Sequence, residues 1–169
     1  ASLRELLLGA VESDLAAIVS HDRSTVEWCD AVRRRSESVP LSLAVATHGD
    51  LTTWNVLVAD DGGVGIVDWE DAAIAGLPMT DLWYLLADLL VVTGESRSSA
   101  VVALRDDTAS LPSAIAAAPD RLTDRLGLDA EASRLLFEST WVMHAANEIR
   151  RGAPGEFVDA VRALAQSGD

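Results

Sequence analysis

Apolar residues recur every three or four positions over several long stretches of the chain, which is the spacing of one face of an α-helix. The clearest of these patterns predict helices over residues 3–19, 24–38 and 129–150. After Pro78, leucines repeat at the same spacing and predict a further helix with a buried apolar face: Leu82, Leu85, Leu86, Leu89 and Leu90. A last helix is expected from Glu156. The chain should therefore be mostly helical.

One short region between the helices has the pattern of β-structure instead. Residues 55–59 and 64–67 are rich in β-branched residues, and Asp60-Asp61-Gly62-Gly63 joins them. That joining sequence favours a tight reversal, so we expect a β-hairpin. Residues 41–47 are expected to be strand-like, and residues 68–78 to form a loop. The predicted fold class is α+β, predominantly helical, with a small β-hairpin.

Composition narrows the possible partners. The 169 residues carry 27 acidic and 13 basic side chains, which give a formal net charge of -14. Such a chain repels polyanions, so nucleic-acid binding is not expected and cationic small ligands are favoured. The longest apolar run, residues 82–92, is interrupted by Asp88 and is too short to cross a membrane. The single cysteine, Cys29, and the lack of a secretory leader pattern favour a reducing, cytoplasmic location.

Polar side chains with catalytic potential cluster around the predicted hairpin. The sequence His48-Gly49-Asp50-Leu51-Thr52-Thr53-Trp54-Asn55 precedes it, and Asp68 follows it. Because antiparallel strands return the chain to its starting point, Asn55 and Asp68 should lie close together. Their oxygen atoms suit Mg²⁺, which is usually held by one or two protein groups together with substrate phosphates. Asp50 remains free to orient and deprotonate an attacking hydroxyl, which points to phosphoryl transfer.

These motifs resemble those of a known enzyme family. Protein kinases carry H-R-D-L-x-x-x-N followed by D-F-G, and the segments 48–55 and 68–70 resemble those two elements. The variant H-G-D-x-x-x-x-N with a later V-D-W is similar to the aminoglycoside phosphotransferase and choline kinase family. This resemblance implies that Asp50 is the catalytic base and that Asn55 and Asp68 are magnesium ligands. His48 would support the catalytic loop.

A third motif extends the resemblance. Family members carry G-D-P-x-x-D-L after the metal-binding segment, and the last Asp of that motif braces the catalytic loop. The present chain has Gly76-Leu77-Pro78-Met79-Thr80-Asp81-Leu82. The resemblance therefore gives Asp81 the bracing role. Leu77 stands where the family pattern has Asp, so the motif leaves the acceptor open.

The resemblance also implies that the sequence covers only part of a kinase-like enzyme. The chain contains no lysine and no G-x-G-x-x-G, which are the groups that hold and cover the nucleotide in kinases. Residues 1–169 are thus expected to be a single C-terminal lobe of a protein-kinase-like fold, without the N-terminal nucleotide lobe. The catalytic loop would be 48–55, the metal-binding segment 67–71 and the helical acceptor-binding region about 79–169.

Two functions follow as hypotheses. The first is an ATP- and Mg²⁺-dependent kinase lobe that phosphorylates a hydroxyl of an aminoglycoside, amino alcohol or sugar-like molecule. The isolated chain is expected to be inactive, because the missing N-terminal lobe is its partner. On the helix over 129–150, Glu138, Trp141 and Glu148 lie off the apolar stripe and would line the acceptor site. The alternative is a non-catalytic acidic binding module derived from such a lobe.

Overall fold

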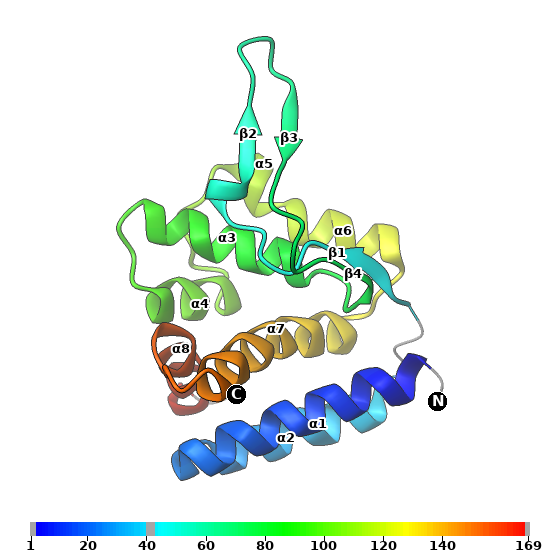
Figure 1. Ribbon diagram of the computed structural model, residues 1–169, viewed down its shortest axis with the longest axis vertical. Helices are drawn as coiled ribbons and strands as arrows, with labels where there is room; N and C mark the ends of the chain where they lie inside the picture. Colours follow the sequence, from blue (N-terminus) through cyan, green and yellow to red (C-terminus); the bar gives the residue numbers. More distant parts are fainter. Residues whose placement is uncertain (1–2, 40–42, 168–169) are drawn as a thin grey trace.

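The computed structural model describes residues 3–39 and 43–167, with side chains from residue 8 onward. Its fold is α+β and mostly helical, as the sequence predicts. A helical body carries a β-hairpin that projects away from it at one end (Figure 1). None of the described helices is long and apolar enough to cross a membrane.

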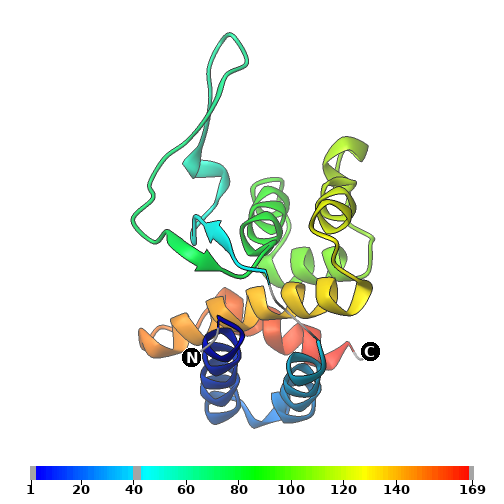
Figure 2. The same cartoon turned by 90° about the vertical axis from the view of Figure 1, so that its right-hand side faces the viewer.

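The first two helices form one layer of the body. Helix α1 (Leu3–His21) and helix α2 (Val26–Ser38) are joined by the short 3-10 helix η1 (Arg23–Thr25). Asp22 caps that turn by accepting a hydrogen bond from the Ser24 N–H. The two helices lie side by side beneath α7 (Figure 2). Both helices confirm the sequence prediction.

The strands form two small antiparallel sheets. Strand β2 (Val56–Val58) pairs with β3 (Val64–Ile66) and makes the predicted hairpin. Strand β1 (Val45–Thr47) pairs with β4 (Ala73–Gly76). The prediction that residues 68–78 form a loop was therefore wrong over β4, which is a strand because β1 supplies its hydrogen-bonding partner. Of the predicted strand over 41–47, residues 41 and 42 lie outside the described part.

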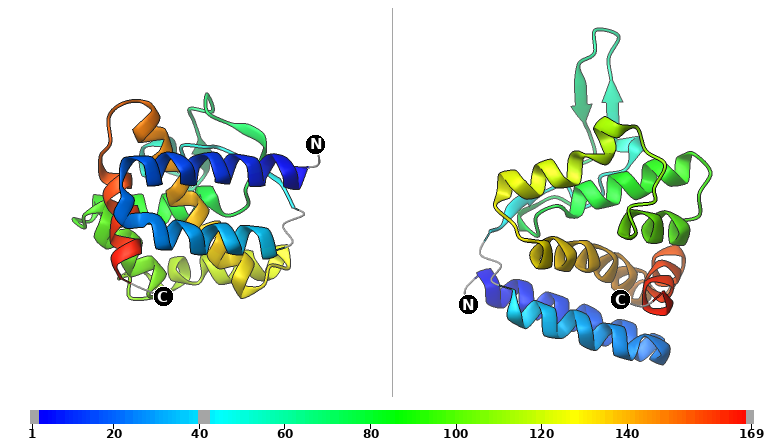
Figure 3. Two further views of the ribbon diagram at one scale, coloured as in Figure 1. Left: turned by 90° about the horizontal axis from the view of Figure 1, so that it is seen from below. Right: turned by 180° about the vertical axis from the view of Figure 1, so that it is seen from behind.

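Strand β4 leads directly into helix α3 (Thr80–Val92). The buried apolar residues of α3 are Trp83, Tyr84, Leu86, Ala87 and Leu90. This face is rotated away from the predicted leucine stripe because α3 packs against both α4 and α7. Helices α4 (Arg97–Arg105), α5 (Ser113–Ala116) and α6 (Ala118–Leu126) follow, and they lie on the same side of α7 as α3 (Figure 3).

Helix α7 (Ala130–Arg150) is the centre of the fold, and α8 (Glu156–Gln166) packs against it and against α4. Asp129 caps α7 by accepting a hydrogen bond from the Ala132 N–H at 2.8 Å. Because α1, α2, α3 and α8 all contact α7, its central turns are buried on nearly every side. The prediction that Glu138 and Trp141 lie away from the buried face of this helix was wrong. Glu138 is 5% exposed and Trp141 is 0% exposed.

Candidate active site

The loop between β1 and β2 contains the predicted catalytic segment and ends in the 3-10 turn η2 (Thr53–Asn55). Gly49 lies in this loop with a positive φ of 86°. A Cβ atom at this position would lie 2.5 Å from the carbonyl oxygen of Asp71. Only glycine allows the loop to pass so close to the segment after the hairpin.

Asp81 in the first turn of α3 holds the start of the loop. Its carboxylate accepts hydrogen bonds from the backbone N–H groups of His48 at 2.7 Å and Gly49 at 3.0 Å. Hydrogen bonds to a charged acceptor are stronger than those between neutral groups. The loop is thereby fixed to the end of α3.

His48 connects the loop to the far end of the hairpin. Its Nδ1 accepts a hydrogen bond from the Asp50 N–H at 3.3 Å, so its Nε2 carries the proton and donates to the Val67 carbonyl at 2.8 Å. The ring is buried and lies 4.8 Å from the ring of Trp69, measured between centroids. With both ring nitrogens occupied by the backbone, His48 is a structural residue of the loop.

Asn55 and Asp68 are neighbours across the base of the hairpin. The Val67 N–H donates to the Asn55 carbonyl at 3.0 Å, and Asp68 is the next residue along the chain. The Asn55 amide nitrogen donates to the Asp50 carbonyl at 2.8 Å, which leaves the amide oxygen available for a ligand. The Asp68 carboxylate is exposed, and its backbone has a φ of 65°.

This donor set fits magnesium. One amide oxygen and one carboxylate are enough for Mg²⁺, because it keeps several waters and binds phosphate oxygens. The described residues contain no cluster of three His, Cys, Asp or Glu side chains that could hold a metal ion by themselves.

A second carboxylate of α3, which the sequence reasoning did not assign to the site, holds the other end of the loop. One oxygen of Asp88 accepts from the Thr53 N–H at 2.8 Å and from its hydroxyl at 2.7 Å. The other oxygen accepts from Arg97 at 3.3 Å. One sequence feature could have identified Asp88, because it interrupts the apolar run of residues 82–92.

A cavity of about 470 Å³ opens beside the loop. Its wall includes Asp50, Tyr84, His144 and Phe157, which come from the loop, α3, α7 and α8. Burial, and after it the negative charge of Asp50, raise the pKa of Tyr84, so this hydroxyl remains protonated near neutral pH. Asp50 thus faces a space between the loop and the C-terminal helices.

The structure brings only one of the three predicted acceptor residues to this cavity. Glu148 lines it, and one oxygen of its carboxylate accepts hydrogen bonds from the Gly155, Phe157 and Val158 N–H groups at the start of α8. Trp141 is fully buried and packs edge-on against Phe137.

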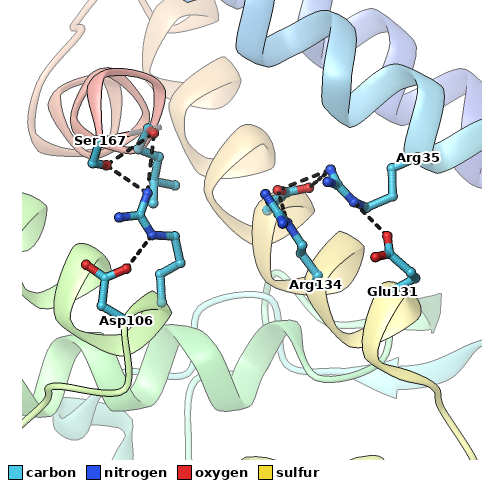
Figure 4. Close-up of polar contacts among 8 residues, drawn as sticks. Arg35, Asp106, Glu131, Arg134 and Ser167 are labelled. Carbon is cyan, nitrogen blue, oxygen red and sulfur yellow. Dashed lines mark hydrogen bonds and ion pairs between the residues drawn. The ribbon is translucent and has the colours of Figure 1, made fainter. Parts of the chain in front are cut away.

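Glu138 lies on the other side of α7. It forms ion pairs with Arg35 at 2.9 Å and Arg134 at 3.1 Å, and it borders a different cavity. Figure 4 shows these two arginines and Glu131, which also pairs with Arg35. The role of Glu138 in the described contacts is to link α7 to α2.

His144, in the cavity wall, gives the stability of the protein a testable dependence on pH. Its ring stacks on that of Phe157 at 4.9 Å and contacts the ring of Tyr84 at 4.2 Å in a tilted arrangement, measured between centroids. Burial, and after it the Arg97 charge, lower the pKa of His144 from an ordinary 6.5 to about 4. Below pH 6.5 the unfolded chain takes up a proton that the folded chain refuses, so stability falls as pH drops through this window.

We expect His144 to account for roughly 3 kcal/mol of lost stability at most between pH 6.5 and 4. Urea unfolding of wild type and His144→Phe across this range measures it, because phenylalanine keeps the aromatic stack but cannot titrate. The pH dependence should be weaker in the variant. Parallel curves for the two proteins would show that His144 does not titrate in this way.

Comparison with known proteins agrees with this geometry. A model of the phosphotransferase enzyme family matches residues 4–121, a stretch that contains both sheets, the loop with Asp50 and all of α3. No curated protein and no solved structure matches the chain. The match covers more than half of the sequence and includes the loop, the hairpin and the Asp81 brace. The chain belongs to the phosphotransferase enzyme family.

Proposed function

We propose that this chain is the catalytic lobe of an ATP- and Mg²⁺-dependent enzyme that phosphorylates a hydroxyl group of a small molecule. The observation that carries the proposal is the placement of Asp50. It lies at the wall of a cavity and belongs to a loop held by two carboxylates of α3. Such rigidity is what positioning of a nucleophile requires.

Asp50 acts as the general base in this proposal. An acceptor in the cavity presents its hydroxyl to the carboxylate, which takes the proton as the hydroxyl oxygen forms a bond to the γ-phosphorus of ATP. The bond to the bridging oxygen breaks, and ADP leaves with that oxygen. Tyr84, which stays protonated, lines the same cavity.

Asn55 and Asp68 are the residues that would hold the metal. Mg²⁺ bound at this position would neutralise the negative charge that develops on the phosphate during transfer. The exposed position of Asp68 at the base of the hairpin leaves room for a nucleotide beside it. The hydrogen bond from Asn55 to the Asp50 carbonyl ties the metal site to the base.

The lining of the cavity supports a cationic acceptor. Five carboxylates and one guanidinium line it: Asp14, Asp50, Asp71, Asp81, Glu148 and Arg151. Three of these carboxylates are occupied, because Asp14 pairs with Arg150 at 2.6 Å, Asp81 accepts from the loop backbone and Glu148 accepts from N–H groups at the start of α8. Asp71 is exposed, and its backbone lies against Gly49, the residue before Asp50. A molecule that carries both an amine and a hydroxyl fits this charge distribution.

Exposed apolar residues in and around the hairpin support the proposal that an N-terminal nucleotide lobe completes the enzyme. Trp54 is 83% exposed and Ile74 is 94% exposed. Leu57, Val58 and Val64 on the hairpin strands are also exposed. Apolar surface gathered beside a site is typical of an interaction surface. The chain itself has no lysine to bind the nucleotide phosphates.

We place this enzyme in the cytoplasm, where ATP is available.

We expect the isolated 169-residue chain to fold but to transfer phosphate at a small fraction of the rate of the full-length protein. The helical core is complete around α7, whereas positioning of the nucleotide supplies most of the catalysis in this reaction class. Circular dichroism and an ADP-release assay on the chain measure the two properties. Full turnover by the chain alone would contradict the expectation.

An acceptor screen tests the proposed function. The full-length protein is incubated with Mg²⁺ and ATP and with amino sugars, amino alcohols and neutral sugars, and acceptor-dependent ADP release is measured. We expect release with at least one amine-bearing acceptor, and none when EDTA removes the metal. Failure of every acceptor class, with intact nucleotide binding, would favour a non-catalytic binding module.

A further inference from the structure

The residues that hold turn η2 are more deeply buried than the turn itself. Asp88 is 6% exposed and Arg97 is 6% exposed, and they form an ion pair at 3.3 Å. Arg97 reaches Glu156 of α8 with the same nitrogen, at 3.3 Å. The pair therefore connects the loop, α3, α4 and α8 at one point.

A buried ion pair is an inefficient source of stability. Removing two charges from water opposes folding, and apolar residues of similar volume often stabilise a core as well or better. Arg97 illustrates the penalty, because its Nε and Nη1 atoms are buried without a hydrogen-bond partner among the described residues. Leucines surround Asp88 in the sequence of α3. What the pair adds is a charged acceptor for Thr53.

That acceptor holds the turn that carries Asn55. Thr53 and Asn55 belong to the same 3-10 turn, which is closed by a hydrogen bond from the Asn55 N–H to the Thr52 carbonyl at 3.1 Å. Asp88 holds the Thr53 N–H and hydroxyl with a single oxygen. Although burial opposes it, these hydrogen bonds keep the pKa of Asp88 below its ordinary value. The carboxylate is thus charged when the site operates.

We propose that Asp88 and Arg97 are positioning residues for the metal site: they hold turn η2 so that the Asn55 amide oxygen faces Mg²⁺. The inference rests on the proposed function and adds two residues to it. Arg97 keeps the second oxygen of Asp88 occupied, which leaves the first oxygen aimed at Thr53. The expected effect of disrupting Asp88 or Thr53 is on magnesium and nucleotide, because neither residue lines the cavity beside Asp50.

Thr53→Val and Thr53→Ser form a matched pair for the test in the full-length protein. Valine removes the hydroxyl that donates to Asp88, whereas serine keeps it. We expect Thr53→Val to raise the Mg²⁺ concentration for half-maximal turnover about threefold, and Thr53→Ser to stay near the wild type. The KM for the acceptor should not change in either variant.

Asp88→Asn is expected to change the Mg²⁺ requirement more than Thr53→Val does, for a geometric reason. An amide has one acceptor oxygen, so it satisfies either Thr53 or Arg97 and places its NH₂ group against the other donor. We expect an increase of about tenfold in the Mg²⁺ requirement. If this variant does not fold, the two Thr53 variants still decide the question.

Hydrogen exchange of the Asn55 backbone N–H in the metal-free protein provides a measurement that does not depend on turnover. Faster exchange in Thr53→Val than in Thr53→Ser supports the proposal. Equal exchange and equal Mg²⁺ dependence in the two variants would overturn it, as would a change confined to the acceptor KM. If the wild type shows no Mg²⁺-dependent nucleotide binding, the proposed function fails, and the metal-positioning role fails with it.

Discussion

Asp50→Asn in the full-length protein is expected to lower kcat by about 10²- to 10⁴-fold, while the affinity for the Mg²⁺-nucleotide complex stays near that of the wild type. Asparagine has almost the same shape as aspartate, but it cannot take a proton from the acceptor. The Asp50 backbone carbonyl, which receives the Asn55 amide, is unchanged by the substitution. The loss should therefore fall on the chemical step.

Asp60→Asn is a suitable control for this experiment. It makes the same acid-to-amide change at an exposed position in the turn of the hairpin, outside the cavity beside Asp50. Steady-state kinetics and nucleotide titration of both variants give kcat and affinity separately. Wild-type turnover by Asp50→Asn would remove Asp50 from the mechanism.

Asp68→Asn is expected to weaken binding of the Mg²⁺-nucleotide complex by at least about tenfold, because it removes a charged metal ligand. Asparagine is the right replacement at this position. Asp68 has a φ of 65°, and asparagine tolerates the left-handed region, whereas alanine would add roughly 1–2 kcal/mol of backbone strain. The change in affinity then reports on the ligand alone.

Calorimetric titration of nucleotide with and without Mg²⁺ separates the metal effect from the nucleotide effect. Asp68→Asn should lose the part of the affinity that depends on Mg²⁺, and Asp61→Asn in the hairpin turn should keep it. Equal Mg²⁺-dependent affinity in wild type and Asp68→Asn would contradict the assignment of Asp68 as a ligand.

The sequence predicted the hairpin and the proximity of Asn55 and Asp68 because both follow from local rules. A Gly-rich joining segment between two β-rich runs favours a tight turn, and an antiparallel pair must bring its ends together. The structure has Asn55 and Val67 joined by a hydrogen bond, one residue before Asp68. The length of α7 and its Asp129 cap were equally local features.

Strand β4 could not be predicted in this way. Three of its four residues are small and the strand is mostly exposed, so it shows no alternation of buried and exposed positions. The strand exists because Gly76 and Ala73 pair with Val45 and Thr47, which are distant in sequence. A Cβ atom on Gly76 would lie 2.4 Å from the Thr47 hydroxyl oxygen. Only the folded arrangement reveals this close approach.

The residues that line the cavity beside Asp50 also could not be predicted from helical periodicity. Helical spacing shows which residues of α7 share a face, but it does not show how many other helices cover that face. Packing of α2 buries Glu138, which pairs with Arg35, and Trp141 is enclosed in the core. Tyr84 and His144 line the cavity instead, and neither had a distinctive sequence context.

The central claim is transfer of the γ-phosphate from ATP to a hydroxyl with Asp50 as the base. Phosphorus NMR of the full-length protein with Mg²⁺, ATP and an acceptor identified in the screen tests it most directly. The wild type should convert the γ-phosphate signal into that of an acceptor phosphate monoester in equal amount, and Asp50→Asn should show almost none of this product in the same time. Release of inorganic phosphate alone, at the same rate in both proteins, would contradict the claim.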